Sequence, residues 1–248
     1  MSVLQELLFN RALPERSTAN RLLARLPDDA FALIEADLRH VTLPQGHVCF
    51  AAGDPIDQVY FPQSGLISLL VMTGAGDMVE TSLIGREGAA GLQAGYGGRT
   101  SFTRGVVQIG GKFSIISAAR FEQATNRSVA LRTTISRYIE LQWAEAQQIA
   151  TCNAIHDGAS RLCRWLLQSA DRIGSDHLLL TQELLSDMLG VRRTTITLLA
   201  QELQKSGLIR YRRGRISILD RAALERRACE CYYAVKQENL CLKLGLKL

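Results

Sequence analysis

The most regular pattern of apolar and polar positions lies in residues 181–220. Behind Thr181, a candidate N-cap, apolar residues recur at the spacing of one helix face: Leu184, Leu185, Met188 and Leu189. Gly190 follows and suits a tight turn between helices. Beyond it the same spacing recurs at Ile196, Leu199, Ala200 and Leu203. Ser206 and Gly207 then end the second helix. The pattern therefore predicts two helices joined by a short turn.

Two short β-type runs follow, residues 208–209 and 216–218, joined by the arginine-rich residues 210–215. Two helices, a turn and a basic hairpin predict a winged helix-turn-helix. The second helix carries polar side chains opposite its apolar face. The candidate DNA-binding residues are Arg192, Arg193, Thr194, Thr195, Thr197, Gln201, Arg212, Arg213 and Arg215.

The distribution of charge supports this interpretation. Residues 189–227 contain ten Lys/Arg and three acidic residues, a net charge of +7, whereas the whole chain carries +5. A concentrated basic patch beside a candidate recognition helix favours binding of double-stranded DNA through its phosphates. The alternative is a solvated basic helical hairpin with no role in nucleic-acid binding.

Residues 41–121 have the pattern of strands. Short apolar runs recur about every ten residues between Gly or Asp turns, which predicts an antiparallel β-roll or sandwich. Two apolar stripes predict leading helices in residues 1–40: Leu4, Leu7 and Leu8, then Leu22, Leu23 and Leu26. The expected fold class is therefore α+β, with an antiparallel β-roll, a long helix and a winged helix-turn-helix.

The long helix is expected at residues 126–153, which contain no Pro or Gly. Its apolar positions fall near the 3.5-residue spacing of a coiled coil, which predicts a seam that pairs with another helix. The candidate interface residues are Ile135, Tyr138, Ile139, Gln142, Ala146 and Ile149. The alternative is a single helix buried against its own β-roll. Gly158 then marks a hinge before a further helix over residues 159–170.

These patterns predict four parts: an effector-binding-like β-roll domain with leading helices (1–125), a dimerisation helix (126–153), a DNA-binding domain (154–228) and a tail without an assigned element (229–248). With 47% hydrophobic residues, the chain can bury ample core. It has no run of about 18 apolar residues and no signal-peptide pattern at its start, so we expect a soluble cytoplasmic protein that does not contact a membrane.

Catalytic and metal-binding signatures are missing from the sequence. No P-loop, GxSxG motif or nucleophile–base pair is recognisable, so we expect no enzymatic activity. The six cysteines are scattered apart from Cys229 and Cys231, and neither paired CxxC spacing nor clustered His residues accompany them. We expect reduced thiols, no metal site and no required cofactor.

Three segments together resemble the Crp/Fnr family of bacterial transcription regulators: residues 188–196, 203–209 and 213–220. Gly46, Gly53 and Gly65 also fall where the cyclic-nucleotide-binding fold of that family places its turn glycines. The resemblance implies a homodimeric regulator that binds DNA and RNA polymerase. Arg193 matches the arginine with which the family reads guanine, whereas Thr194 and Leu198 depart from its best-known members, which implies a different operator.

The resemblance also places an effector segment at residues 85–101, with Glu87, Gly88, Arg99 and Thr100 as candidate ligands. Arg99 and Thr100 match the pair that holds the phosphate in cyclic-nucleotide sensors. Ala89 stands where those sensors have the ribose-binding Glu, so we expect weak or no binding of cyclic AMP. The alternatives are a small anion or another phosphate ester at Arg99, or a vacant pocket.

Other functions stay open at this point. An iron–sulfur sensor of this family would need an N-terminal cysteine cluster, and residues 1–48 contain no Cys. A haem sensor is compatible with the sequence. The alternative to a regulator is an anion- or cyclic-nucleotide-responsive sensor whose C-terminal half serves as a protein-interaction module.

Overall fold

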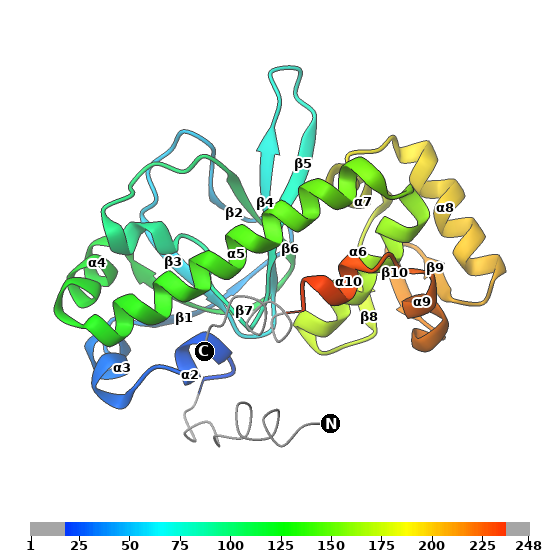
Figure 1. The fold of residues 1–248 in the computed structure, drawn as a ribbon. Coiled ribbons are helices and arrows are strands. Elements are labelled where there is room, and N and C mark those ends of the chain that lie inside the picture. Colours follow the sequence, from blue (N-terminus) through cyan, green and yellow to red (C-terminus); the bar gives the residue numbers. More distant parts are fainter. Residues whose placement is uncertain (1–17, 237–248) are drawn as a thin grey trace.

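The computed structural model describes residues 18–236 (Figure 1). A β-rich N-terminal unit lies at one end and a helical C-terminal unit at the other, and the long helix α5 (Val129–Ile155) runs from the first to the second. The predicted α+β fold class is confirmed. The stripe at Leu4, Leu7 and Leu8 lies outside the described residues.

The N-terminal unit follows the predicted change of period. Its elements are α2 (Arg21–Ala24), α3 (Asp28–Glu35), β1 (Arg39–Leu43), β2 (Val48–Phe50), β3 (Gln58–Pro62), β4 (Leu66–Met72), β5 (Met78–Ile84), the 3-10 helix η1 (Leu92–Tyr96), β6 (Arg104–Ile109), β7 (Gly111–Ser117) and α4 (Ala118–Arg127). The strands form two antiparallel sheets, in the orders β1-β7-β3 and β2-β6-β4-β5. This arrangement is the expected β-roll.

Helix α5 differs from the sequence expectation at both ends. Ser128 separates it from α4, because the Ser128 hydroxyl caps α5 by accepting a hydrogen bond from the Leu131 N–H. At the other end α5 continues to Ile155, two residues beyond the predicted limit.

The inner face of α5 covers the core of its own β-roll. Ile135 and Tyr138 pack there beside Phe121, and Ile149 is also buried within the single chain. These three residues were expected at a dimer interface, and their burial corrects that expectation. A helical period marks an apolar stripe but does not identify what covers it. Trp143 is the large apolar residue that α5 leaves exposed at mid-helix, at 67%.

The C-terminal unit contains the predicted helices and hairpin. Its elements are α6 (Gly158–Ile173), β8 (His177–Leu179), α7 (Gln182–Leu189), α8 (Arg193–Lys205), β9 (Ile209–Arg212), β10 (Arg215–Ile218), α9 (Arg221–Arg227) and α10 (Cys231–Ala234). A third antiparallel sheet, in the order β8-β10-β9, forms the wing. Helix α6 begins at Gly158, where the Asp157 carboxylate caps it.

The two units share a continuous apolar core. Trp165 and Leu166 of α6 pack against Leu66 and Leu83 from the four-stranded sheet. Helix α7 also packs against β5 of this sheet. Gly190, which follows α7, lies so close to the side chain of Val79 that an added Cβ would be 3.0 Å from it. The C-terminal unit is therefore held against the β-roll by direct packing as well as by the covalent connection through α5.

The segment after α9 has structure that the sequence did not predict. Residues 229–236 include α10, which packs against α5 and α6. Tyr232 is fully buried, and its hydroxyl donates a hydrogen bond of 2.9 Å to Asp171 of α6. The apolar alternation expected at residues 240–246 lies outside the described residues. Among the helices of residues 18–236, none is long and apolar enough to cross a membrane.

A buried carboxyl group joins the two units at the shared core. Glu80 on β5 accepts hydrogen bonds from the Trp165 indole N–H at 2.8 Å and from the Ser68 hydroxyl at 2.5 Å. Burial raises the pKa of the Glu80 carboxyl from 4.5 to about 7, against the opposing effect of both hydrogen bonds. Near neutral pH the contact between the sheet and α6 therefore contains a group that is partly protonated.

We predict a pH dependence of stability from Glu80. Because the folded pKa lies above the unfolded value, this contribution is fully present below pH 4.5 and is lost as the pH rises through about 7. The loss corresponds to about 3 kcal/mol, since one pKa unit is worth about 1.4 kcal/mol. Urea unfolding between about pH 5 and pH 8 measures it. Glu80→Gln keeps an acceptor for Trp165 and should flatten this part of the profile; an unchanged slope in that variant would contradict the assignment.

Candidate nucleic-acid interface

The turn between α7 and α8 places the second helix at the surface. The Thr181 hydroxyl caps α7 by accepting a hydrogen bond from the Leu184 N–H at 3.2 Å. Gly190 ends α7 with φ 60°, a left-handed conformation that favours glycine. Arg192 then occupies the N-cap position of α8, and no side chain caps this helix. The first amides of α8 are thus available to an external acceptor such as a phosphate oxygen.

Helix α8 has the two faces that its sequence predicts. Its inner face is buried in the C-terminal core through Ile196, Ala200 and Leu203. The expected contact residues are exposed or half-buried on the outer face, where they include Arg192, Arg193, Thr194, Thr195, Thr197 and Gln201. No acidic side chain occurs in the first turn of α8.

The wing is a tight hairpin that displays three arginines. Arg212 pairs with Arg215 across the turn, which leaves a two-residue loop. Arg213 and Gly214 have φ values of 51° and 72°, the positive values at both central positions that a type I′ turn needs. The side chains of Arg212, Arg213 and Arg215 are exposed. The predicted basic residues of α8 and of the wing are therefore all at the surface of the C-terminal unit.

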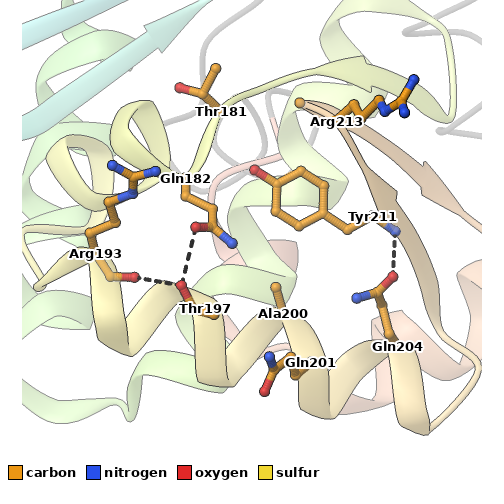
Figure 2. Close-up of a pocket in the computed structure, with 10 residues that line it drawn as sticks. Thr181, Gln182, Arg193, Thr197, Ala200, Gln201, Gln204, Tyr211 and Arg213 are labelled. Carbon is orange, nitrogen blue, oxygen red and sulfur yellow. Dashed lines mark hydrogen bonds between the residues drawn. The ribbon is translucent and has the colours of Figure 1, made fainter.

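A groove separates α8 from the wing (Figure 2). Its lining residues come from α7, α8 and the hairpin: Thr181, Gln182, Arg193, Thr197, Ala200, Gln201, Gln204, Tyr211, Arg213 and Gly214. Gln204 accepts a hydrogen bond of 2.8 Å from the Tyr211 N–H, which ties α8 to the wing. The Thr197 hydroxyl lies 3.1 Å from the Gln182 side-chain oxygen, which ties α8 to α7.

Six groove residues were not among the predicted DNA contacts: Thr181, Gln182, Ala200, Gln204, Tyr211 and Gly214. Gln204 lies on the polar face of α8, so its position was visible in the helical period. Tyr211 lies within the arginine-rich hairpin, and its hydroxyl donates to the Leu180 carbonyl at 3.2 Å. That long-range hydrogen bond has no signal in the sequence. The hydrogen bonds of Gln182, Gln204 and Tyr211 fix the position of α8 relative to α7 and the wing, and thus the positions of the predicted arginines.

The predicted effector residues lie apart and have different partners. Glu87 accepts hydrogen bonds from Arg172 of α6 at 2.9 Å and from the Gly85 N–H at 2.9 Å. Arg99 is exposed and pairs with Glu122 of α4 at 3.1 Å. Thr100 is exposed, and its backbone bridges to Pro55. The structure therefore uses the Glu87 carboxylate for a contact between the two units.

Gly88 packs directly beneath α5. A Cβ at this position would lie 1.6 Å from the Tyr138 hydroxyl oxygen, so only glycine fits. Ala89, at the position of the missing ribose-binding Glu, is fully buried. The segment that resembles an effector site is thus in contact with α5 and α6.

Comparisons with known proteins agree with this geometry. Residues 160–227 match the family model for the Crp-like helix-turn-helix domain. A comparison with curated proteins found no match.

Several solved structures share the fold. FixK2 from Bradyrhizobium japonicum is 14% identical with a TM-score of 0.67, over 77% of this chain and 98% of FixK2. CLP from Xanthomonas campestris, described as a c-di-GMP-responsive global regulator, is 16% identical with a TM-score of 0.64, over 78% of this chain and 100% of CLP. A Crp/Fnr-family transcriptional regulator from Thermus thermophilus is 22% identical with a TM-score of 0.62, over 77% of this chain and 98% of that protein.

Proposed function

We propose that this chain, which has the fold of the Crp/Fnr regulators and contains a Crp-like helix-turn-helix domain, is a homodimeric, sequence-specific transcription regulator. The observation that carries the proposal is the joint exposure of Arg192, Arg193 and the wing arginines beside an uncapped helix N-terminus. The proposed partners are double-stranded DNA, a second copy of the chain and RNA polymerase, the last from the family resemblance alone.

The division of labour on DNA follows from position. Arg193 is at the first turn of α8 and borders the groove, where a helix inserted in the major groove presents its N-terminal residues to base edges. The wing arginines are at a hairpin tip and suit phosphate oxygens. Arg193 therefore reads sequence, and Arg212, Arg213 and Arg215 supply affinity that is independent of sequence.

We predict different effects for two arginine variants. Arg193→Ala should cost about 1–3 kcal/mol on the preferred site and relax the preference at one base pair per half-site. Arg213→Ala should weaken all duplexes alike and lower the salt slope by about one. Binding titrations on a selected site and on random duplex, each at several salt concentrations, measure both effects. Equal losses on the two duplexes for Arg193→Ala would contradict its role in base recognition.

The proposed dimer uses the outer face of α5. Ile139, Trp143, Ala146 and Ala150 follow one another at spacings of four, three and four residues, which is the repeat of a coiled-coil seam. Ile139 and Ala146 are half-buried, and Trp143 is exposed. This face keeps Ile139, Gln142 and Ala146 from the sequence expectation. It replaces Ile135, Tyr138 and Ile149, which are already buried within the single chain. A second copy would cover Trp143.

We predict that Trp143→Glu gives a folded monomer with weak DNA binding. The exposed side chain contributes little to the fold of one chain, whereas a dimer places two recognition helices about 34 Å apart on successive turns of DNA. Light scattering gives the mass, and thermal unfolding checks the fold. The matched variant Ile135→Asp should unfold instead, since Ile135 is buried within its own chain. A monomeric unmodified protein, even on its DNA site, would rule out the dimer.

The proposed regulator binds DNA without cyclic AMP. Buried Ala89 offers no acceptor for a ribose hydroxyl, and the nearby Glu87 carboxylate is engaged by Arg172. An unmatched buried polar group costs about 1–3 kcal/mol, which disfavours the nucleotide. If an effector exists, it is a small anion or another phosphate ester at the exposed Arg99.

We predict that calorimetric titration with cyclic AMP gives no saturable heat and that DNA affinity is unchanged in its presence. Arg99→Ala serves as the matched variant, because it removes the charged member of the predicted phosphate-binding pair without touching a buried contact. Micromolar affinity for cyclic AMP that Arg99→Ala abolishes would contradict this expectation and would assign the effector site to Arg99 after all.

A further inference from the structure

Four side chains with metal-binding atoms converge where α5 ends. Cys152 lies in the last turn of α5 and His156 is the C-cap residue of that helix, whereas Cys229 and Cys231 flank Glu230 at the start of α10. Their ligand atoms all lie within 4.8 Å of one another. The sulfurs of Cys152 and Cys229 are 3.4 Å apart, and the Cys231 sulfur is 3.6 Å from Nδ1 of His156.

These separations match the edges of a zinc coordination tetrahedron. With Zn–S bonds of about 2.3 Å and Zn–N bonds of about 2.0–2.1 Å, tetrahedral angles place two sulfurs about 3.8 Å apart and a sulfur and a nitrogen about 3.6 Å apart. The observed 3.4 and 3.6 Å are therefore close to the required values. The three cysteines are buried, whereas His156 is half-buried at the edge of the cluster.

A carboxylate orients the histidine as in known zinc sites. Nε2 of His156 lies 3.1 Å from the Glu230 carboxylate, which fixes the proton on Nε2 and leaves Nδ1 free to face the sulfurs. The Gln148 side-chain amide donates to the Cys231 sulfur at 3.1 Å, a hydrogen bond that favours a thiolate. Both contacts lie outside the four candidate ligands and support them.

Buried positive charge surrounds the same sulfurs. Arg161 and Arg164 of α6 are buried, and both interact electrostatically with Cys152 and Cys229. Within residues 18–236, neither guanidinium forms an ion pair with a carboxylate. Three thiolates, a neutral imidazole and Zn²⁺ carry a net charge of −1, so the occupied site would place negative charge beside these arginines.

We propose that these four side chains bind one Zn²⁺ ion as a closed Cys3His site. Four protein ligands leave no open position, so the site is structural. A polynuclear iron–sulfur cluster fits poorly, because its thiolates bind different irons and lie farther apart than sulfurs that share one ion. The remaining alternative is a disulfide between Cys152 and Cys229.

At this location the ion would link two segments that lie far apart in the sequence. Cys152 and His156 lie at the end of α5, whereas Cys229 and Cys231 follow the helix-turn-helix domain in the chain. Zinc would therefore join the C-terminal end of α5 to the residues that follow the DNA-binding domain in the chain. The ion would lie near Asp157, where α5 connects to α6. This site is independent of the proposed DNA contacts on α8 and on the wing.

Metal analysis of the full chain, purified under reducing conditions, tests the proposal. We expect one zinc per chain and six titratable thiols after denaturation and chelation. Replacement with Co²⁺ should give the intense d–d and sulfur-to-metal bands of a tetrahedral thiolate site. The double variant Cys229→Ser/Cys231→Ser should lose the metal, whereas Cys49→Ser, outside the cluster, should keep it.

A milder variant keeps the test valid if the double variant does not fold. Glu230→Gln removes an exposed carboxylate that supports His156, so it should keep the zinc stoichiometry and weaken the affinity about 10–100-fold in competition with a chromophoric chelator. Zinc-free protein that gives no thiolate bands on addition of Co²⁺ would overturn the proposal. So would a Cys152–Cys229 disulfide in the reduced preparation.

Discussion

The arrangement of the two units depends on one buried guanidinium group. Arg172 of α6 donates to Glu87 of the β-roll at 2.9 Å and to Glu145 of α5 at 2.7 Å, and all three side chains are largely buried. Burial raises the pKa of Glu145, and the charge of Arg172 opposes that shift. Removing one member of such a network leaves an uncompensated buried charge, at a cost of about 3–5 kcal/mol. The DNA-binding domain therefore cannot leave the β-roll without breaking a desolvated ion pair.

That constraint explains why the effector-like segment departs from the family pattern. The segment lies at the point where the β-roll, α5 and α6 meet, and Gly88 is pressed against the Tyr138 hydroxyl. A side chain aimed from here into a ligand pocket would have to leave this packing. Glu87 instead points to Arg172, two residues before Ala89, the position where a ribose ligand would be expected. Residues 85–88 of the segment therefore contact both α5 and α6.

The sequence predicted elements whose signals are local. The apolar period of α7 and α8, Gly190 between them and the arginine-rich hairpin lie within forty residues, and each followed from its own stretch of chain. The partner of each face of α5 was harder to predict, because Ile135 fits the repeat of a coiled coil and the core of a β-roll equally well. The Cys3His cluster was invisible, since Cys152 and Cys229 are separated by 77 residues and only the packing of α10 brings them together. Tertiary contacts of this kind leave no periodic trace.

The ion pair and the proposed zinc site would act on the same helical hairpin from opposite ends. Glu145 is ten residues before the end of α5, and Arg172 is fourteen residues after the start of α6, so both lie about 15–20 Å from the turn at Asp157. Cys152 and His156 lie close to that turn. A hairpin held at both ends cannot change its angle freely. In the proposed dimer, the seam on α5 would then fix the distance between the two α8 helices, and with it the spacing of the half-sites that the protein can bind.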